Sequence, residues 1–238
     1  MSHLNSAAMT GMDALSSSAG GFGADSDGPY DLALLEGGRH LYLYDVVAST
    51  RVDVVPVWRF GSTADRHERA LLERGTGPLL DLGCGPGRMV KASMTIGRPA
   101  LGVDLSRAAC ELAVAQGLPV LHRSLFDPLP GEGRWGTVLL IDGNIGIGGD
   151  PAVLLARAAA LAEPGGTVIV EAHTDATTDT SITAMLLDDL GRRSTSFRWA
   201  RVGSYALRGH ARRAGLRLTR EWSADGRFFC EYAVPTTE

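Results

Sequence analysis

The chain has 238 residues, of which 45% are hydrophobic and 21% are charged, and its formal net charge is −4. This composition is typical of a soluble globular domain, and no apolar run is long enough to cross a bilayer. The acidic balance also argues against nucleic acid as a default partner, because nucleic-acid-binding domains are usually basic.

The three cysteines, Cys84, Cys110 and Cys230, are too few and too widely spaced for a disulfide framework or a zinc site. The N-terminus lacks the apolar core that a secretory signal needs. We therefore expect a cytoplasmic protein with reduced thiols, no bound metal and no membrane partner.

The first 61 residues divide into two parts. Residues 1–28 are rich in Ser, Gly, Ala and Asp, and we expect a disordered tail because this composition buries too little apolar surface to offset its conformational entropy. Residues 29–61 contain two β-rich runs, 41–47 and 51–57, which predict an N-terminal hairpin that caps the main domain.

Residues 62–238 predict one α/β domain. A helix is expected to run from Ser62 or Thr63, either of which would be its N-cap, to Arg74. Apolar runs then alternate with helical segments, as in parallel sheets whose strands are covered on both faces. The expected strands are 79–82, 100–103, 119–121, 136–141 and 167–171, and the expected helices are 87–96, 106–116 and 151–162.

An insertion of about residues 172–202 interrupts this alternation. It contains a polar loop, an expected helix at 181–190 and a possible strand at 195–200. The remaining expected elements are a helix near 203–214 and strands near 216–222 and 227–234. An Asp-Gly turn between these last two strands predicts that they pair in antiparallel fashion.

The first strand of the sheet runs into a glycine-rich turn, DLGCGPGR at residues 81–88, and the next strand ends in Asp104. Such a turn, followed by an acid at the tip of the next strand, predicts a site for a ribose-bearing cofactor. Arg88 occupies the place where a dinucleotide-binding turn has its third small residue. A wider turn of exposed amides suits an amino-acid carboxylate better than a diphosphate.

Four segments in order carry a resemblance to the class I S-adenosylmethionine-dependent methyltransferases. Residues 81–87 resemble the first motif of that family, and 103–104 resemble the second. Residues 125–130 are similar to the segment after the third strand, and 163–166 to the Pro-Gly-Gly turn before the fifth. The resemblance covers about residues 62–234.

This resemblance implies a Rossmann-like, doubly wound α/β fold. Its seven-stranded sheet would be mostly parallel, with strand order 3-2-1-4-5-7-6 and an antiparallel last strand. The implied cofactor is S-adenosyl-L-methionine, with S-adenosyl-L-homocysteine as the product. Residues 133–136 and 141–151 also resemble a group of small actinobacterial methyltransferases.

The resemblance also implies the cofactor-binding residues. Asp104 would accept both ribose hydroxyls, although it could instead be the N-cap of the helix near Ser106. Asp81 would lie under the methionine end, although a structural network would look the same in sequence. Ser124 stands where relatives commonly carry an Asp that binds the adenine amino group, so we expect weaker binding of the adenine. The full predicted set is Asp81, Gly83, Cys84, Gly85, Gly87, Asp104, Leu105, Ser124, Leu125, Asp142 and Gly143.

Two residues near the carboxyl ends of strands are candidate catalytic groups. His173 follows the fifth strand and could be a general base, although a solvated histidine would look the same. Asn144 leaves the fourth strand at the edge of the cleft, in a glycine-rich loop that could equally be a simple connector.

Two aromatic and cationic clusters, 58–60 and 197–199, are candidate walls of an acceptor pocket, with ordinary packing as the alternative. The predicted substrate residues are Trp58, Arg59, Arg198 and Trp199. The arginines between 192 and 220 are expected to form a solvated surface rather than a nucleic-acid surface.

The predicted function is in-line methyl transfer from S-adenosylmethionine to an oxygen, nitrogen or carbon atom of a small molecule. The N-terminal hairpin and the insertion 172–202 would cap the acceptor. Two alternatives stay open. One is a protein that binds S-adenosylmethionine without transferring methyl groups. The other is a nucleic-acid methyltransferase, which the absence of an Asn/Asp-Pro-Pro-aromatic motif disfavours.

Overall fold

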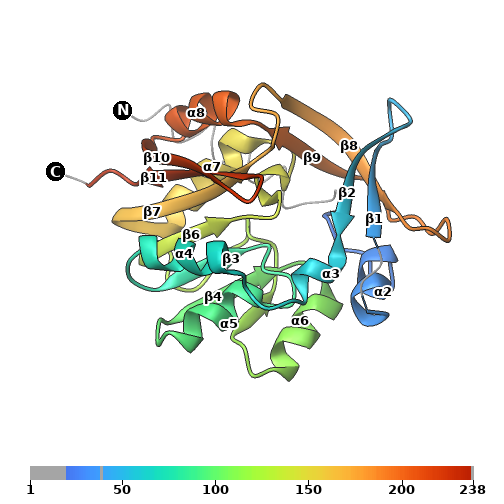
Figure 1. Ribbon diagram of the computed structural model, residues 1–238, viewed down its shortest axis with the longest axis horizontal. Helices are drawn as coiled ribbons and strands as arrows, with labels where there is room; N and C mark the ends of the chain where they lie inside the picture. The colour runs from blue at the N-terminus through green and yellow to red at the C-terminus, as the bar shows by residue number, and fades with distance from the viewer. Residues whose placement is uncertain (1–19, 38–39, 237–238) are drawn as a thin grey trace.

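A computed structural model describes residues 20–37 and 40–236 (Figure 1). Its larger sheet has the strand order β10-β11-β7-β6-β3-β4-β5. The strands are β3 (Leu79–Leu82), β4 (Ala100–Asp104), β5 (Val120–His122), β6 (Trp135–Leu140), β7 (Ala162–Ala172), β10 (Arg217–Ala224) and β11 (Arg227–Ala233). From its other edge, and numbered within the sheet, this is the predicted order 3-2-1-4-5-7-6. β11 runs antiparallel to both neighbours, which confirms the predicted fold class.

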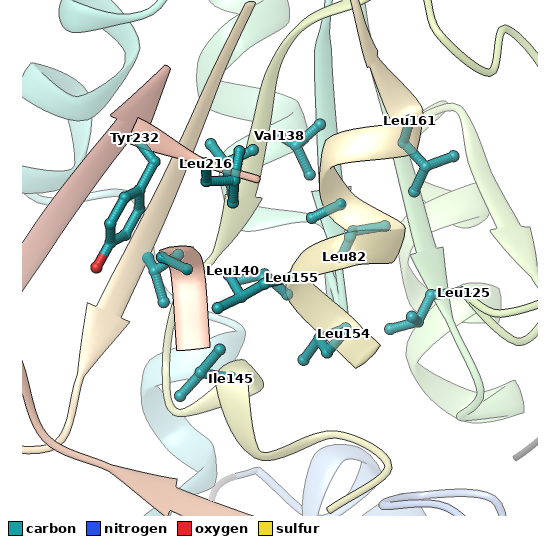
Figure 2. Close-up of a cluster of buried hydrophobic side chains, with 14 of the residues drawn as sticks. Leu82, Leu125, Val138, Leu140, Ile145, Leu154, Leu155, Leu161, Leu216 and Tyr232 are labelled. Carbon is teal, nitrogen blue, oxygen red and sulfur yellow. The ribbon is translucent and has the colours of Figure 1, made fainter. Parts of the chain in front are cut away.

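Helices cover both faces of this sheet because apolar side chains of its strands point alternately to the two sides. The helices are α4 (Arg66–Arg74), α5 (Arg88–Thr95), α6 (Arg107–Ala115), α7 (Pro151–Leu161) and α8 (Ser204–Arg213). On one face, Leu82 and Leu140 pack with Leu154 and Leu155 of α7, as Figure 2 shows. On the other face, Leu139 packs with residues of α4 and α5.

Helix α4 begins at a different cap from the one expected. Asp65, rather than Ser62 or Thr63, accepts hydrogen bonds from the N–H groups of His67 and Glu68, at 2.7 and 2.9 Å. The Glu68 carboxylate accepts from the Asp65 N–H at 3.0 Å, which completes a capping box. The helix is therefore shorter than predicted.

A second, four-stranded antiparallel sheet lies beside the first (Figure 1). Its order is β2-β1-β8-β9, so the N-terminal hairpin pairs with the insertion. The strands are β1 (His40–Asp45), β2 (Thr50–Pro56), β8 (Asp179–Leu187) and β9 (Phe197–Val202), and the short helices are α2 (Pro29–Leu35), α3 (Val57–Phe60) and η1 (Asn144–Gly146). The predicted hairpin is confirmed by the pairing of β1 with β2.

The expected helix at 181–190 is wrong, because that segment is strand β8. Ala184 and Leu186 are buried and Met185 less so, a period of two that a strand gives. β8 pairs with β1 on one side and β9 on the other. Hydrogen bonding along both edges therefore overrides the helix-forming Ala, Met and Leu side chains of the segment.

The expected disorder of residues 1–28 is wrong for the part that the structure describes, since Gly20 bridges to Phe197. The ring of Phe22 packs against Tyr30 and Trp199, with centroid distances of 5.0 and 5.3 Å. Residues 1–19 lie outside the described residues. Within the described ranges, no helix is both long and apolar enough to span a membrane.

Candidate cofactor and acceptor site

A cavity of about 370 Å³ lies at the carboxyl ends of β3, β4, β6 and β7, and strands of the second sheet form its opposite wall. Ligands of open α/β sheets bind at this edge. All predicted cofactor residues except Gly87 line it: Asp81, Gly83, Cys84, Gly85, Asp104, Leu105, Ser124, Leu125, Asp142 and Gly143.

The glycine turn brings bare backbone to the cavity. Gly83 and Gly85 have φ of +75° and +54°, in the left-handed region that favours glycine. A Cβ on Gly83 would lie 2.6 Å from Asn144 Nδ2, so no larger residue fits there. Gly87 faces away from the cavity, because its missing Cβ would lie 2.7 Å from Leu118. Gly87 therefore serves packing at the start of α5.

Asp104 is held by two backbone donors at the tip of β4. Its carboxylate accepts hydrogen bonds from the N–H groups of Gly85, at 2.7 Å, and Ser106, at 2.8 Å. The N-cap of α6 is Ser106, which accepts from the Ala109 N–H, so the capping alternative for Asp104 is wrong. Burial raises the pKa of the Asp104 carboxyl. A carboxylate so fixed at the cavity wall suits the two hydroxyls of a ribose.

Asp81 is buried beside the glycine turn, and its Oδ1 has no hydrogen-bond partner among the described residues. Burial, and then the charge of Asp142, raise the pKa of Asp81 to about 7. An unpaired carboxylate oxygen in a cavity wall is unfavourable until a donor or a cation reaches it. It therefore fits the amino group of an amino-acid-bearing cofactor.

Under the cavity, three arginines converge on one buried glutamate. Arg59, Arg88 and Arg227 lie within 2.8, 2.9 and 2.8 Å of Glu68 Oε1. Arg88 and Arg227 also bind Asp142, whose N–H donates to Glu171 at 2.6 Å. Arg88 therefore replaces the third small residue of the turn because its side chain joins this network. Its partners lie far away in sequence, so only the structure reveals the network.

Asp142 and Arg59, both predicted site residues, belong to this network. The carboxylate of Asp142 is engaged by Arg88 and Arg227, and Arg59 is paired with Glu68. Both residues line the cavity, and their roles toward a ligand stay predictions. Burial raises the pKa of Asp142, although Arg88 opposes the change. Gly143, with φ of +83°, follows Asp142 into the cavity wall, and its cofactor role stays a prediction.

Asn144 holds the glycine turn in place. Its amide Nδ2 donates hydrogen bonds to the carbonyl oxygens of Leu82 and Gly83, each at 2.8 Å. These bonds use both amide hydrogens. The side chain therefore positions the turn, and this geometry does not support the catalytic role expected for it.

The adenine end of the predicted site has a cover that the sequence did not predict. A Cβ on Gly21 would lie 2.5 Å from Leu105, so the segment at residues 20–22 crosses directly over Leu105. The hydroxyl of Ser124 accepts from the Phe126 N–H at 3.2 Å. The composition of residues 1–28 indicates disorder, so sequence reasoning missed this cover. Phe22 was the one residue that could have indicated it.

The acceptor end is formed by the second sheet. Arg198 and Trp199 line the cavity as predicted, together with Asp53 and Arg201, which were not predicted as site residues. Trp58 does not line it and is 55% exposed, because helix α3 directs it outward. The alternation of Phe197, Trp199 and Arg201 along a strand could have identified Arg201, had the insertion been assigned to a sheet.

His173 lies at the end of β7 and lines the cavity. Its Nδ1 accepts from the Asp175 N–H at 3.0 Å, and its Nε2 lies 2.8 Å from Arg201 Nη2. Both partners are donors and a neutral imidazole has one acceptor nitrogen, so only one of these contacts is a hydrogen bond, and it occupies the lone pair that a base would need. This geometry disfavours a general-base role, which stays a prediction.

The residues that line the cavity carry the chemical groups that binding of S-adenosylmethionine would need. Asp104 offers a fixed carboxylate for a ribose, Asp81 offers an unpaired carboxylate for an amino group, and the turn offers amides. Within the described chain, no three His, Cys, Asp or Glu residues are grouped so as to hold a metal ion.

The strand order and this site define the class I methyltransferase architecture, and comparisons with known proteins agree. A family model described as a methyltransferase domain matches residues 58–221. A ubiquinone biosynthesis O-methyltransferase of Methylococcus capsulatus is 32% identical over 158 residues, which are 55% of this chain and 63% of that protein. The chain belongs to the methyltransferase domain family.

Two solved structures share the fold. A SAM-dependent methyltransferase from Bacteroides fragilis, in complex with S-adenosyl-L-homocysteine, has a TM-score of 0.70 and 17% identity over 87% of this chain and 92% of its own. A 1,6-didemethyltoxoflavin-N1-methyltransferase from Burkholderia thailandensis has a TM-score of 0.53 and 18% identity, over 71% of this chain and 77% of its own.

Proposed function

We propose that this protein transfers a methyl group from S-adenosylmethionine to an oxygen, nitrogen or carbon atom of a small molecule. One observation carries the proposal: a single cavity reaches from the glycine turn and Asp104 to Trp199 and Asp53 in the second sheet. A cofactor at the first end and an acceptor at the second would share one enclosed space.

When bound, S-adenosylmethionine supplies a methyl group that is already activated by its positively charged sulfur. The chain would then need to bind, orient and exclude water. Asp104 would hold the ribose, Asp81 the amino group and the amides of the turn the carboxylate. Asn144 keeps the turn in shape through its bonds to Leu82 and Gly83. The proposal assigns no metal to the site.

The relatives support a small acceptor. The Burkholderia thailandensis structure contains bound 1,6-didemethyltoxoflavin, a small molecule, and the Methylococcus capsulatus relative is named for ubiquinone biosynthesis. Because this chain spans 63% of that relative's length, the acceptor is not transferred from it. We also place the reaction in the cytoplasm, where the buried free thiols of Cys84, Cys110 and Cys230 would stay reduced.

Two measurements test the proposal. Calorimetric titration should show binding of S-adenosylmethionine and S-adenosylhomocysteine, and absence of binding would refute the cofactor. Incubation with methyl-labelled cofactor and a small-molecule extract of the source cells should then label a low-molecular-weight product. Cofactor binding with no labelled product would favour a protein that does not methylate, and a labelled nucleic acid in a whole extract would favour a nucleic-acid methyltransferase.

A further inference from the structure

Arg201 directs its side chain to the acceptor end of the cavity. It lies on β9, two residues from Trp199 and four from Phe197, and residues at this spacing share a face of a strand. Phe197 and Trp199 pack into the buried cluster between the second sheet and helix α2. Arg201 continues that face beyond the cluster and lines the cavity, and its side chain is 23% exposed.

The guanidinium of Arg201 is incompletely paired. Its Nη2 lies 2.8 Å from His173 Nε2, but its buried Nε has no hydrogen-bond partner in the described part of the chain. The nearest carboxylate, Asp53, is 3.9 Å from Nε and half exposed, so this contact is longer than a hydrogen bond. A buried donor without an acceptor is unfavourable, so an oxygen-bearing ligand would complete the group.

Two other arginines at the cavity, Arg59 and Arg88, are engaged in ion pairs. Arg59 donates to Glu68 at 2.8 Å, and Arg88 binds Glu68 and Asp142. Neither is available to an incoming anion without breaking a buried ion pair. Arg198 also lines the cavity, but it is adjacent to Trp199 on β9 and therefore lies on the opposite face of that strand. Arg201 shares the face of Trp199 and stands beside the aromatic pair of Phe22 and Trp199, where it can recognise an anion.

We propose, resting on the methyltransferase function above, that the acceptor is a planar carboxylic acid whose carboxylate is bound by Arg201. The planar fork of a guanidinium matches the two oxygens of a carboxylate, which a point charge does not. A flat, unsaturated acceptor would pack on Trp199 and leave its methylated atom toward the glycine turn. Because Asp53 is half exposed, its carboxylate would turn to solvent when the acceptor's carboxylate binds.

The test begins with the labelled product of methyl transfer to an extract of the source cells. The product should be retained on an anion exchanger at pH 7, and coupling of its carboxylates to a neutral amine should abolish the retention. With the purified acceptor, Arg201→Gln should raise KM by about 10- to 100-fold and leave kcat and cofactor affinity unchanged. The KM of Arg201→Lys should fall between those of the wild type and Arg201→Gln, since lysine keeps the positive charge but lacks the planar fork of the guanidinium.

A matched control is Arg220→Gln, because Arg220 is exposed on β10 and does not line the cavity. Its KM should equal that of the wild type. A neutral or cationic product, a product that stays retained after coupling, or an unchanged KM in Arg201→Gln would overturn this inference and leave the proposed function standing. If no small molecule is labelled, the proposed function fails and this inference fails with it.

Discussion

Replacement of Glu68 by Gln tests whether the buried ion network stabilises the fold. The Glu68 carboxylate is 1% exposed and lies against Arg59, Arg88 and Arg227. Glutamine keeps the shape and removes the charge, so the two buried guanidinium groups of Arg88 and Arg227 and the partly exposed one of Arg59 lose their shared partner. Breaking a buried pair by removing one partner costs about 3–5 kcal/mol. At roughly 2–4 °C per kcal/mol for a chain of this size, Tm should fall by roughly 6–20 °C.

The effect should depend on pH with a defined sign. Burial opposes ionisation of Glu68, but Arg88 and then Arg59 outweigh it and hold the pKa of this carboxyl below its ordinary 4.5. A lowered pKa contributes stability that is present above pH 4.5 and is lost as the pH falls through the folded-state pKa. The Tm difference between wild type and Glu68→Gln should therefore be full at pH 7 and shrink below pH 4.5.

Differential scanning calorimetry at pH 7 and pH 4 measures both effects. The matched control is Glu111→Gln, which removes an exposed pair with Arg107 at 2.7 Å and should leave Tm nearly unchanged. A Tm loss in Glu68→Gln no larger than that of Glu111→Gln would refute the reasoning, and so would a loss that grows on acidification.

Three further predictions concern the cofactor end. Asp104→Ala should raise the Kd for S-adenosylmethionine by about 10- to 100-fold in calorimetry, and an unchanged Kd would refute the ribose assignment. Gly83→Ala should abolish this binding because its Cβ would meet Asn144, whereas Gly97→Ala, with φ of +78° and nothing within 4 Å, should retain it. Burial raises the pKa of Asp81 from 3.8 to about 7, so ionisation opposes folding as pH rises through that interval. The gain in unfolding free energy from Asp81→Asn should therefore be larger at pH 8 than at pH 5, by about 3 kcal/mol, with a correspondingly larger rise in Tm, and the reverse order would contradict it.

The central sheet could be predicted because most of its strands are short apolar runs with a glycine or proline near one end. β3 and α7 begin at the expected residues, 79 and 151. The second sheet could not be fully predicted, because β8 is a strand only through its pairing with β1 and β9. Segment 179–187 has a local preference for helix, and distant hydrogen bonds decide its structure.

The candidate site also has a part that the sequence predicts and a part that it does not. Asp104 and Gly83 follow from a local pattern, and the structure places both at the cavity. Arg59 and Asp142 also line the cavity, but no pattern in the sequence indicated the ion pairs that hold them. Their actual partners include Glu68 and Arg227, which is 85 residues from Asp142 in the sequence. Ion pairs over such separations leave no signal in a single sequence.

The same network links the two ends of the cavity. Arg59 follows the hairpin of the second sheet through helix α3, while Arg88 begins the helix that follows the glycine turn. Because both bind Glu68, the wall that would hold the acceptor is fixed against the turn that would hold the cofactor. Residues outside this network, such as Arg201, can be substituted to change acceptor binding without moving the glycine turn. Substitutions there should therefore alter KM for the acceptor, whereas substitutions at Glu68 should alter stability and both ligands together.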